Sequence, residues 1–256
     1  MSSAPISYIN APLLELPNCE QIEELAQWNF AVADELLFTK MVQQDRGETA
    51  VKEAINRQSS IPILEHELSP YYADRNEPKH LLDNRTSLER TIARRLLKRW
   101  PSTDFPQSSV AFQLLRSTAD QLHAGRWRKG LVQCLPDRMG YAVRFPHPDQ
   151  IAGRLEQIFE CLRSNYERHP VYAATAALSA ISSIHPLTDG NGRLSRVIFN
   201  TIIAKRFETD FYLPVYELAH VSNGGFIVSI RNSQYYNKWS DLSAFILNSL
   251  RIFSAR

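Results

Sequence analysis

The sequence predicts a mainly α-helical protein that carries one small β element. Over most of the chain, apolar residues recur at steps of three and four, which is the pattern of amphipathic helices. A clear alternation of the kind that marks a strand appears around residues 138–146. The 256 residues are 44% hydrophobic and 22% charged, as is typical of globular domains. One large core and two modest ones both fit this length.

The N-terminal part is expected to be helical after a loose arm of about ten residues. Apolar residues between positions 19 and 56 fit one or two helices. The Ser-Ser-Ile-Pro run at 59–62 ends this region, since proline disfavours helix in the residue before it. A loop rich in Pro, Asp and Asn is expected through 69–84, followed by a helix over 86–100 that Pro101 ends.

The second part of the chain is expected to hold most of the helices. A helix over 108–125 closes with Gly125, the residue type favoured just past a helix end. Tyr141, Val143 and Phe145 alternate with other residues and indicate a short strand or hairpin arm. Further helices are expected at 148–167, 170–184, 192–206 and 239–252. A soft boundary near 101–106 divides the chain into an N-terminal helical region, 1–100, and a second domain, 101–256.

Composition and cysteine usage indicate the redox compartment of this protein and the kinds of partner it can have. Cys19, Cys134 and Cys161 are far apart and show no CxxC spacing, which argues against a disulfide framework or a cysteine zinc site. A reducing cytoplasm fits best. The N-terminus lacks the pattern of a signal peptide, and the most apolar stretch, 171–184, is too short to span a bilayer. The formal charge of +2 neither requires nor excludes a polyanionic partner.

The segment from His185 to Arg196, HPLTDGNGRLSR, carries the chemistry. Gly190 and Gly192 flank Asn191, so the backbone can turn sharply and present successive N–H groups, and a helix is expected to start directly after them. Such a turn binds anions. Arg193 shares a face of that helix with Arg196, and two cations in a first turn are favourable when a bound polyphosphate reverses the field of the helix dipole.

Two further residues complete a site for group transfer from a nucleotide. Asp189 offers a hard oxygen ligand suited to Mg²⁺, which takes one or two carboxylates and the phosphates of its substrate. His185 at the loop entrance is a natural general base near neutral pH. The chain contains no Walker loop and no kinase-type HRD sequence. The nucleotide must therefore be bound in another way.

This segment resembles the signature of the Fic proteins, H-x-F-x-[D/E]-G-N-G-R-x-x-R, and departs from it only where Leu187 replaces Phe. Three flanking stretches extend the resemblance to about residues 107–250. They are Gly125–Arg128, which resembles a G-x-[YF]-R motif, Tyr141–Pro148, which resembles the arm of the β-hairpin flap, and the run 213–230. The implied fold is a Fic-type helical bundle core with a small β-hairpin flap, here preceded by an N-terminal helical extension.

The resemblance implies a protein adenylyltransferase, which transfers AMP from ATP to a Ser, Thr or Tyr hydroxyl of a target protein. By carry-over, His185 is the general base and Asp189 holds Mg²⁺. Asn191, Arg193 and Arg196 complete the catalytic set. The nucleotide phosphates are expected to contact Gly190, Asn191, Gly192, Arg193 and Arg196. Leu187 is expected to fill the apolar pocket of the family's Phe with looser packing.

The resemblance also predicts partners and a mode of regulation. The flap near 140–145 is expected to hold a segment of the target protein by strand-like main-chain bonds. Many relatives carry an inhibitory motif, [S/T]-x-x-x-E-[G/N], whose Glu pairs with the second signature arginine. Near residues 53–65 that motif is not intact, since Ile63 stands at the Glu position. We therefore expect no inhibition by such a helix, and leave room for an inhibitory partner or a homo-oligomer.

Three other functions fit parts of the sequence. The protein could be a nucleotide-binding regulator with a Fic fold but no catalysis, or it could transfer another phosphate-containing group. The basic run within 86–100 could bind nucleic acid. We favour its interpretation as the solvent-facing side of an amphipathic helix, since Glu89 and leucines interleave with it. A calcium loop at 189–200 is excluded, because Arg193 and Asn200 stand where ligands are needed.

Overall fold

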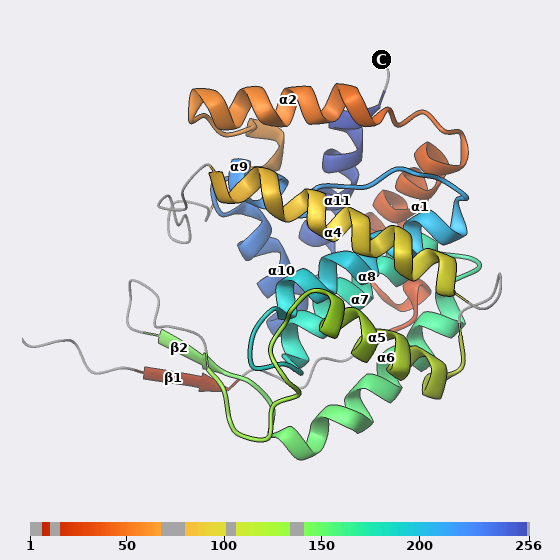
Figure 1. Ribbon diagram of the computed structural model, residues 1–256. Coiled ribbons are helices and arrows are strands. Elements are labelled where there is room, and N and C mark those ends of the chain that lie inside the picture. The colour runs from red at the N-terminus through yellow and green to blue at the C-terminus, as the bar shows by residue number, and fades with distance from the viewer. Residues whose placement is uncertain (1–6, 11–15, 68–79, 101–105, 134–140, 255–256) are drawn as a thin grey trace, which may run out of the picture.

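The computed structural model describes residues 7–10, 16–67, 80–100, 106–133 and 141–254. Helices dominate this part of the chain, with two short strands at one side (Figure 1). The prediction of a mainly helical protein is therefore confirmed. Within the described ranges, no helix combines the length and the apolar content needed to cross a membrane.

The N-terminal region contributes a strand and three long helices. Strand β1 (Ser7–Asn10) is followed by the short helix η1 (Cys19–Gln21) and by α1 (Glu24–Phe38). Helix α2 (Gln44–Arg57) leads through η2 (Pro62–Leu64) to α4 (His80–Arg99). Of the one or two helices expected between residues 19 and 56, the structure thus has two long ones, α1 and α2.

The remaining elements run from α5 (Ser108–Gln121) to the C-terminus. Strand β2 (Tyr141–Arg144) and the turn η3 (Pro148–Gln150) come before α6 (Ile151–Asn165). Then follow α7 (Pro170–Ile184), α8 (Asn191–Arg206), α9 (Val215–Val221), α10 (Gly225–Tyr236) and α11 (Ser240–Phe253). The helices predicted at 108–125, 170–184, 192–206 and 239–252 are confirmed to within a few residues.

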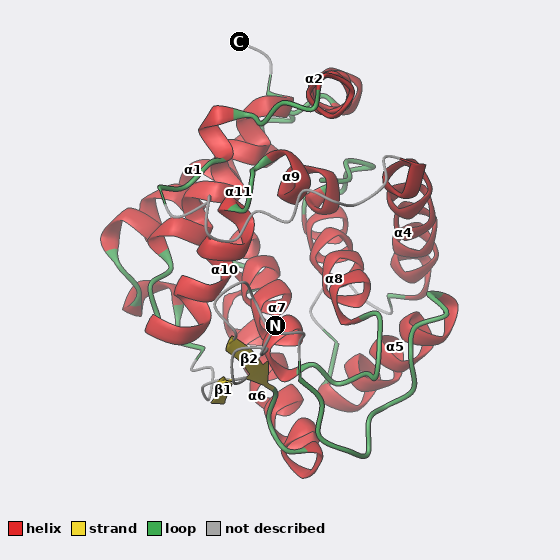
Figure 2. Ribbon diagram, turned by 90° about the vertical axis from the view of Figure 1, so that its left-hand side faces the viewer, coloured by secondary structure: helices red, strands yellow, loops and turns green. Residues whose placement is uncertain are grey.

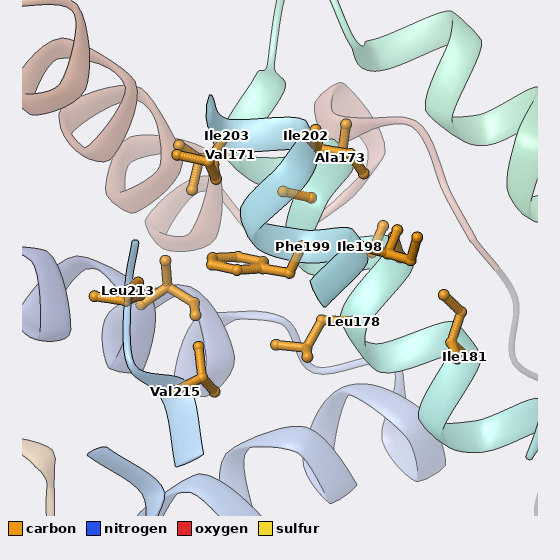
Figure 3. Packing of buried hydrophobic residues seen from close by; sticks show 14 of the residues in the cluster. Val171, Ala173, Leu178, Ile181, Ile198, Phe199, Ile202, Ile203, Leu213 and Val215 are labelled. Carbon is orange, nitrogen blue, oxygen red and sulfur yellow. The ribbon is translucent and has the colours of Figure 1, made fainter. Parts of the chain in front are cut away.

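Helices α7 and α8 form the centre of one hydrophobic core. All but one of the side chains of α7 are buried, and its many alanines allow α8 to approach closely. Figure 3 shows Phe199 of α8 lying toward Leu213 and Val215, with Leu178 of α7 beside it. The same cluster includes buried residues of α1, α2 and α4, so residues 1–100 and 101–256 share this core. Within the described residues, buried side chains from before and after position 100 thus belong to one cluster.

The structure corrects the sequence expectations at three places. The first ten residues were expected to be a loose arm, but residues 7–10 form β1, whose strand partner β2 is remote in sequence. Helix α4 begins at His80, inside the stretch expected to be a loop. Helices α9 and α10 were not predicted, since the run 213–230 was interpreted only through its resemblance to the family; Gly224 at φ 95° caps α10.

Candidate functional site

The signature segment is the connection between α7 and α8. His185 ends α7 in the left-handed conformation, at φ 52°, which histidine adopts more readily than most residues. Gly190 caps α8 at φ 81°, and a side chain there would lie 2.7 Å from the Cβ of Ala124. The connection is therefore a tight loop that delivers its polar residues to the N-terminus of α8, as the sequence predicted.

The segment 125–128 runs beside this loop and holds it in place by main-chain hydrogen bonds. Gly125 lies so close that an added Cβ would be 2.2 Å from Thr188 Oγ1. Trp127 and Leu187 form an antiparallel bridge. Main-chain N–H groups of 125, 128 and 188 donate to the carbonyl oxygens of 189, 186 and 126 at 3.0, 3.1 and 2.9 Å. Leu187 is fully buried, which confirms that it fills an apolar pocket.

Arg128 joins the signature loop to the base of the flap. Its guanidinium is buried, and Nε donates to the carbonyl oxygen of His185 at 2.6 Å. Nη2 donates to the carbonyl oxygens of Ile184, at 3.1 Å, and Pro146, while Nη1 donates to Gly130. Four carbonyl acceptors on one cation fix the relative position of these segments. The sequence motif included Arg128 but gave no indication of this role.

The ring of His185 is held by two contacts, and its pKa is lowered. Its ring stacks on that of Phe145, with centroids 3.8 Å apart, and Nδ1 lies 3.3 Å from the carbonyl oxygen of Ser182. Burial lowers the pKa of His185 to about 4, and the charge of Arg128 acts in the same direction. With Nδ1–H donating to Ser182, the lone pair on Nε2 is available to accept a proton.

The Asn191 side chain closes the signature loop. Oδ1 accepts the main-chain N–H of Leu187 at 2.8 Å, and Nδ2 donates to the carbonyl oxygen of the same residue at 2.9 Å. The residue is buried, so both of its polar groups serve the loop. In this arrangement, the Asn191 group that could contact a phosphate is its backbone N–H.

The N-terminus of α8 has the features expected of an anion site. The first intrahelical bond runs from the N–H of Leu194 to the carbonyl of Gly190, and within the described residues no side chain caps the helix. The N–H groups of residues 191–193 are thus left for a ligand, at the positive end of the helix dipole. Arg193 lies beside them and donates to Asp189 Oδ2 at 3.0 Å and to the carbonyl of Leu122 at 3.2 Å.

Asp189 fits the role of a magnesium ligand. Its carboxylate side chain is 78% exposed, and Oδ1 accepts the N–H of Gly190 at 2.6 Å. Among the residues described, no group of three or more acidic, His or Cys side chains could hold a metal ion. Among the described residues, Asp189 could thus supply one carboxylate to a cation, which is compatible with Mg²⁺, since this ion usually takes only one or two protein carboxylates.

Arg196 is held by a carboxylate from another helix. Glu89 of α4 accepts Arg196 Nε at 3.0 Å and Nη2 through its second oxygen, and Tyr212 Oη donates to Glu89 at 3.1 Å. Glu89 is 1% exposed, and Tyr216 lies under the guanidinium at 4.9 Å. Figure 2 shows α4 running alongside α8, which is how residues 107 positions apart meet.

This ion pair corrects two expectations. Glu89 does not lie on the solvent-facing side of its helix, although basic residues of that helix, among them Arg94, Arg95, Lys98 and Arg99, are exposed as expected. The glutamate that pairs with Arg196 also does not come from the region 53–65 but is Glu89, although Arg85 and Arg90 stand where the inhibitory motif requires Ser or Thr and Gly or Asn. Glu53 itself is exposed and pairs with Arg57.

The flap lies next to His185. Arg144 of β2 bridges to Gln133, and the N–H of Phe145 donates to the carbonyl of Val132 at 3.1 Å, so the two arms pair in antiparallel fashion. Part of the expected flap, residues 134–140, lies outside the described residues. The other edge of β2 is paired with β1.

Sequence comparisons relate this chain to one family. A model of the Fic/DOC family matches residues 109–203. A Fido domain-containing protein of Dictyostelium discoideum is 36% identical over 99 residues, which are 37% of this chain and 66% of that protein. A protein adenylyltransferase of Caenorhabditis elegans is 32% identical over 117 residues, 42% of this chain and 22% of the relative. A protein adenylyltransferase of Drosophila willistoni is 37% identical over 62 residues, 23% of this chain and 12% of that protein. The chain thus spans less than two thirds of each relative.

Solved structures agree with the fold. A crystal structure of a Fic family protein from Desulfovibrio desulfuricans superposes with a TM-score of 0.60 at 14% identity, over 93% of this chain and 75% of that one. A fragment of Fic-1 from C. elegans gives a TM-score of 0.50 at 15% identity, over 89% and 68% of the two chains. At such identities the likeness concerns the fold alone.

Proposed function

Because this chain is a Fic domain protein, we propose that it is a protein adenylyltransferase, which transfers AMP from ATP to a Ser, Thr or Tyr hydroxyl of a target protein. One observation carries the proposal. The imidazole of His185, half-buried and stacked on Phe145, is held at the entrance of a loop whose far end is the N-terminus of α8, where no side chain among the described residues caps the helix. A base and an anion site are thereby set on one rigid segment.

His185 and the N-terminus of α8 can together account for the proton transfer and the attack on phosphorus. Nε2 of His185 accepts the proton of the target hydroxyl, and the hydroxyl oxygen attacks the α-phosphorus of ATP. The bond between the α-phosphorus and the oxygen bridging to the β-phosphorus breaks, and pyrophosphate leaves. The N–H groups of residues 191–193 stabilise the charge on the α-phosphate. Asn191 and Arg128 act as positioning residues, since their bonds fix the loop.

The outer phosphates need positive charge, and two arginines supply it. Arg193 is 27% exposed and shares Asp189 with the site proposed for Mg²⁺. When bound, Mg²⁺ supplies charge neutralisation between neighbouring phosphates, with Asp189 as its protein ligand. Arg196 is still engaged by Glu89. A phosphate can bind the Arg196 guanidinium only when the Glu89 carboxylate moves away from it. The ion pair between Glu89 and Arg196 therefore competes with productive nucleotide binding.

The target protein is proposed to approach along the flap. Phe145 connects β2 directly to the His185 ring, so a segment paired with β2 lies next to the base. Main-chain pairing requires no particular sequence, which suits an enzyme that reads a hydroxyl in an extended segment.

One specific observation favours a second function, that of a nucleotide-binding regulator without transfer. In this structure Arg196 donates two hydrogen bonds to Glu89. A protein in which Glu89 stayed on Arg196 would bind a nucleotide without orienting its outer phosphates for reaction. The two functions differ in a covalent product.

Labelling with radioactive ATP tests the proposal. The protein is incubated with Mg²⁺ and ATP labelled at either the α- or the γ-phosphate, alone and with a cell lysate as acceptor. We expect protein-bound label from α-labelled ATP only, and none with His185→Ala. Label from γ-labelled ATP would mean transfer of phosphate instead. Nucleotide binding without any label would favour the regulator.

A further inference from the structure

The strand β2 has two edges, and both are occupied. One edge belongs to the flap itself, through the bridge of Arg144 to Gln133. Along the other edge lies β1, which runs parallel to β2 (Figure 1). The register pairs Ser7 with Tyr141, Tyr8 with Ala142, Ile9 with Val143 and Asn10 with Arg144. A segment from the chain's own N-terminus therefore fills the second edge.

This second edge leads to the proposed base. Asn10 is opposite Arg144, and the next residue of the flap is Phe145, whose ring stacks on His185 at 3.8 Å. Arg128 fixes the same part of the flap by donating to the carbonyl oxygens of Pro146 and His185. Any strand paired with this edge is thus held at a fixed position relative to the His185 imidazole.

We propose that residues 7–10 are a resident competitor of the target protein: they occupy the edge of β2 along which an extended target segment pairs, and they must leave before transfer. The effect of this competition on AMP transfer rests on the proposed function. The displacement of residues 7–10 by a peptide does not depend on it. The partner that fits this edge is an extended peptide, because the groups offered by β2 are the N–H and carbonyl groups of a strand edge.

The strand β1 has the properties of an exchangeable occupant. It is four residues long and, among the described strands, pairs with β2 alone; such two-strand pairs are marginally stable in water. The chain is anchored again soon after it, where Tyr172 Oη donates to the carbonyl of Pro17 and the N–H of Cys19 donates to Asn165 Oδ1 at 3.2 Å. A short tether between β1 and this anchor gives the strand an effective concentration of about 1 mM. The tethered strand therefore raises the apparent Kd of a target segment by a factor of one plus the ratio of this concentration to the Kd that the same strand would have without its tether.

A peptide-binding experiment tests the competition without relying on catalysis. The probe is a fluorescein-labelled peptide with the sequence of residues 5–12, and its binding is followed by fluorescence anisotropy. The release variant carries Ser7→Gly, Tyr8→Ser, Ile9→Gly and Asn10→Ser in the full chain, which removes strand propensity and keeps the length. The control variant carries Ser2→Gly, Ser3→Gly and Ala4→Gly, which loosens the same terminus outside β1.

We expect the release variant to bind the peptide about tenfold more tightly than the wild type, and the control variant to bind like the wild type. In the wild type, excess peptide should speed hydrogen exchange of the amides of residues 7–10 and leave residues 142–144 protected. This second measurement needs no variant. Equal peptide affinity of wild type and release variant, or unchanged exchange at 7–10, would overturn the proposal.

The outcome for the strand is separable from the outcome for the enzyme. If labelling depends on His185 but peptide affinity is the same in all variants, AMP transfer stands and the competition is wrong. If the release variant binds the peptide tenfold more tightly while no protein is labelled by ATP, the competition stands and the proposed function fails.

Discussion

Replacing Glu89 by Gln should destabilise the free protein and strengthen its binding of MgATP. Glu89 and Arg196 form a buried pair with two hydrogen bonds between them, and Tyr212 supplies a third bond to the carboxylate. Removal of one partner of such a pair costs about 3–5 kcal/mol, because the other charge stays buried. A glutamine can still accept one hydrogen bond, so we expect a loss near the lower limit, about 3 kcal/mol.

The loss should be visible as a change in unfolding temperature. For a chain of this size, about 3 kcal/mol corresponds to a fall in Tm of roughly 6–12 °C. A nucleotide that places a phosphate on Arg196 replaces the missing charge, and a ligand at 100 times its Kd contributes about 2.7 kcal/mol. Scanning calorimetry with and without MgATP should thus show a larger nucleotide-induced rise in Tm for Glu89→Gln than for the wild type.

The matched control is Glu48→Gln. Glu48 of α2 pairs with Arg90 of α4 at 3.1 Å, and this pair is partly exposed. We expect a change in Tm of at most a few degrees and the nucleotide response of the wild type. The reasoning would be refuted by a Glu89→Gln protein that is as stable as the wild type, or that gains no more from MgATP than the wild type does.

Three further predictions concern single residues. His185 should stay neutral between pH 5.5 and 8, since its pKa is about 4; an NMR titration of the imidazole with a midpoint near 6.5 would contradict this. Asn191→Ala should lower the free energy of unfolding by about 1–3 kcal/mol, because two buried main-chain groups of Leu187 lose their partners. Denaturation with urea measures this, and an unchanged midpoint would exclude the positioning role. Burial raises the pKa of Asp34 to about 7, so the folded state holds a proton that the unfolded state has lost above pH 4. Stability should therefore fall by about 1.4 kcal/mol for each pH unit between 4 and 7 on account of this group, and a chain with Asp34→Asn that falls as steeply would disprove it.

The signature loop was predictable because its chemistry is local. Gly190, the arginines and His185 lie within twelve residues, and the spacing alone predicts an anion site at a helix start. The long helices were predictable for a similar reason, since their apolar spacing is repeated over several turns.

Contacts between distant segments were not predictable in this way. Glu89 meets Arg196 only because α4 packs on α8, and the position of Glu89 among basic residues suggested a solvent-facing side. Strand β1 is four residues long and is defined by its pairing with β2. Arg128 has no neighbouring carboxylate in sequence, and its four acceptors are main-chain carbonyl groups, which carry no sequence signal.

The most direct test of the central claim is the mass of the protein products after reaction with MgATP. Wild-type protein and a mixed pool of acceptor proteins are analysed by mass spectrometry, and released pyrophosphate is measured in parallel. We expect AMP adducts on hydroxyl side chains, one pyrophosphate for each adduct, and neither product with His185→Ala. Adducts that form equally well without His185, or ATP bound with no adduct on any protein, would contradict transfer of AMP by this site.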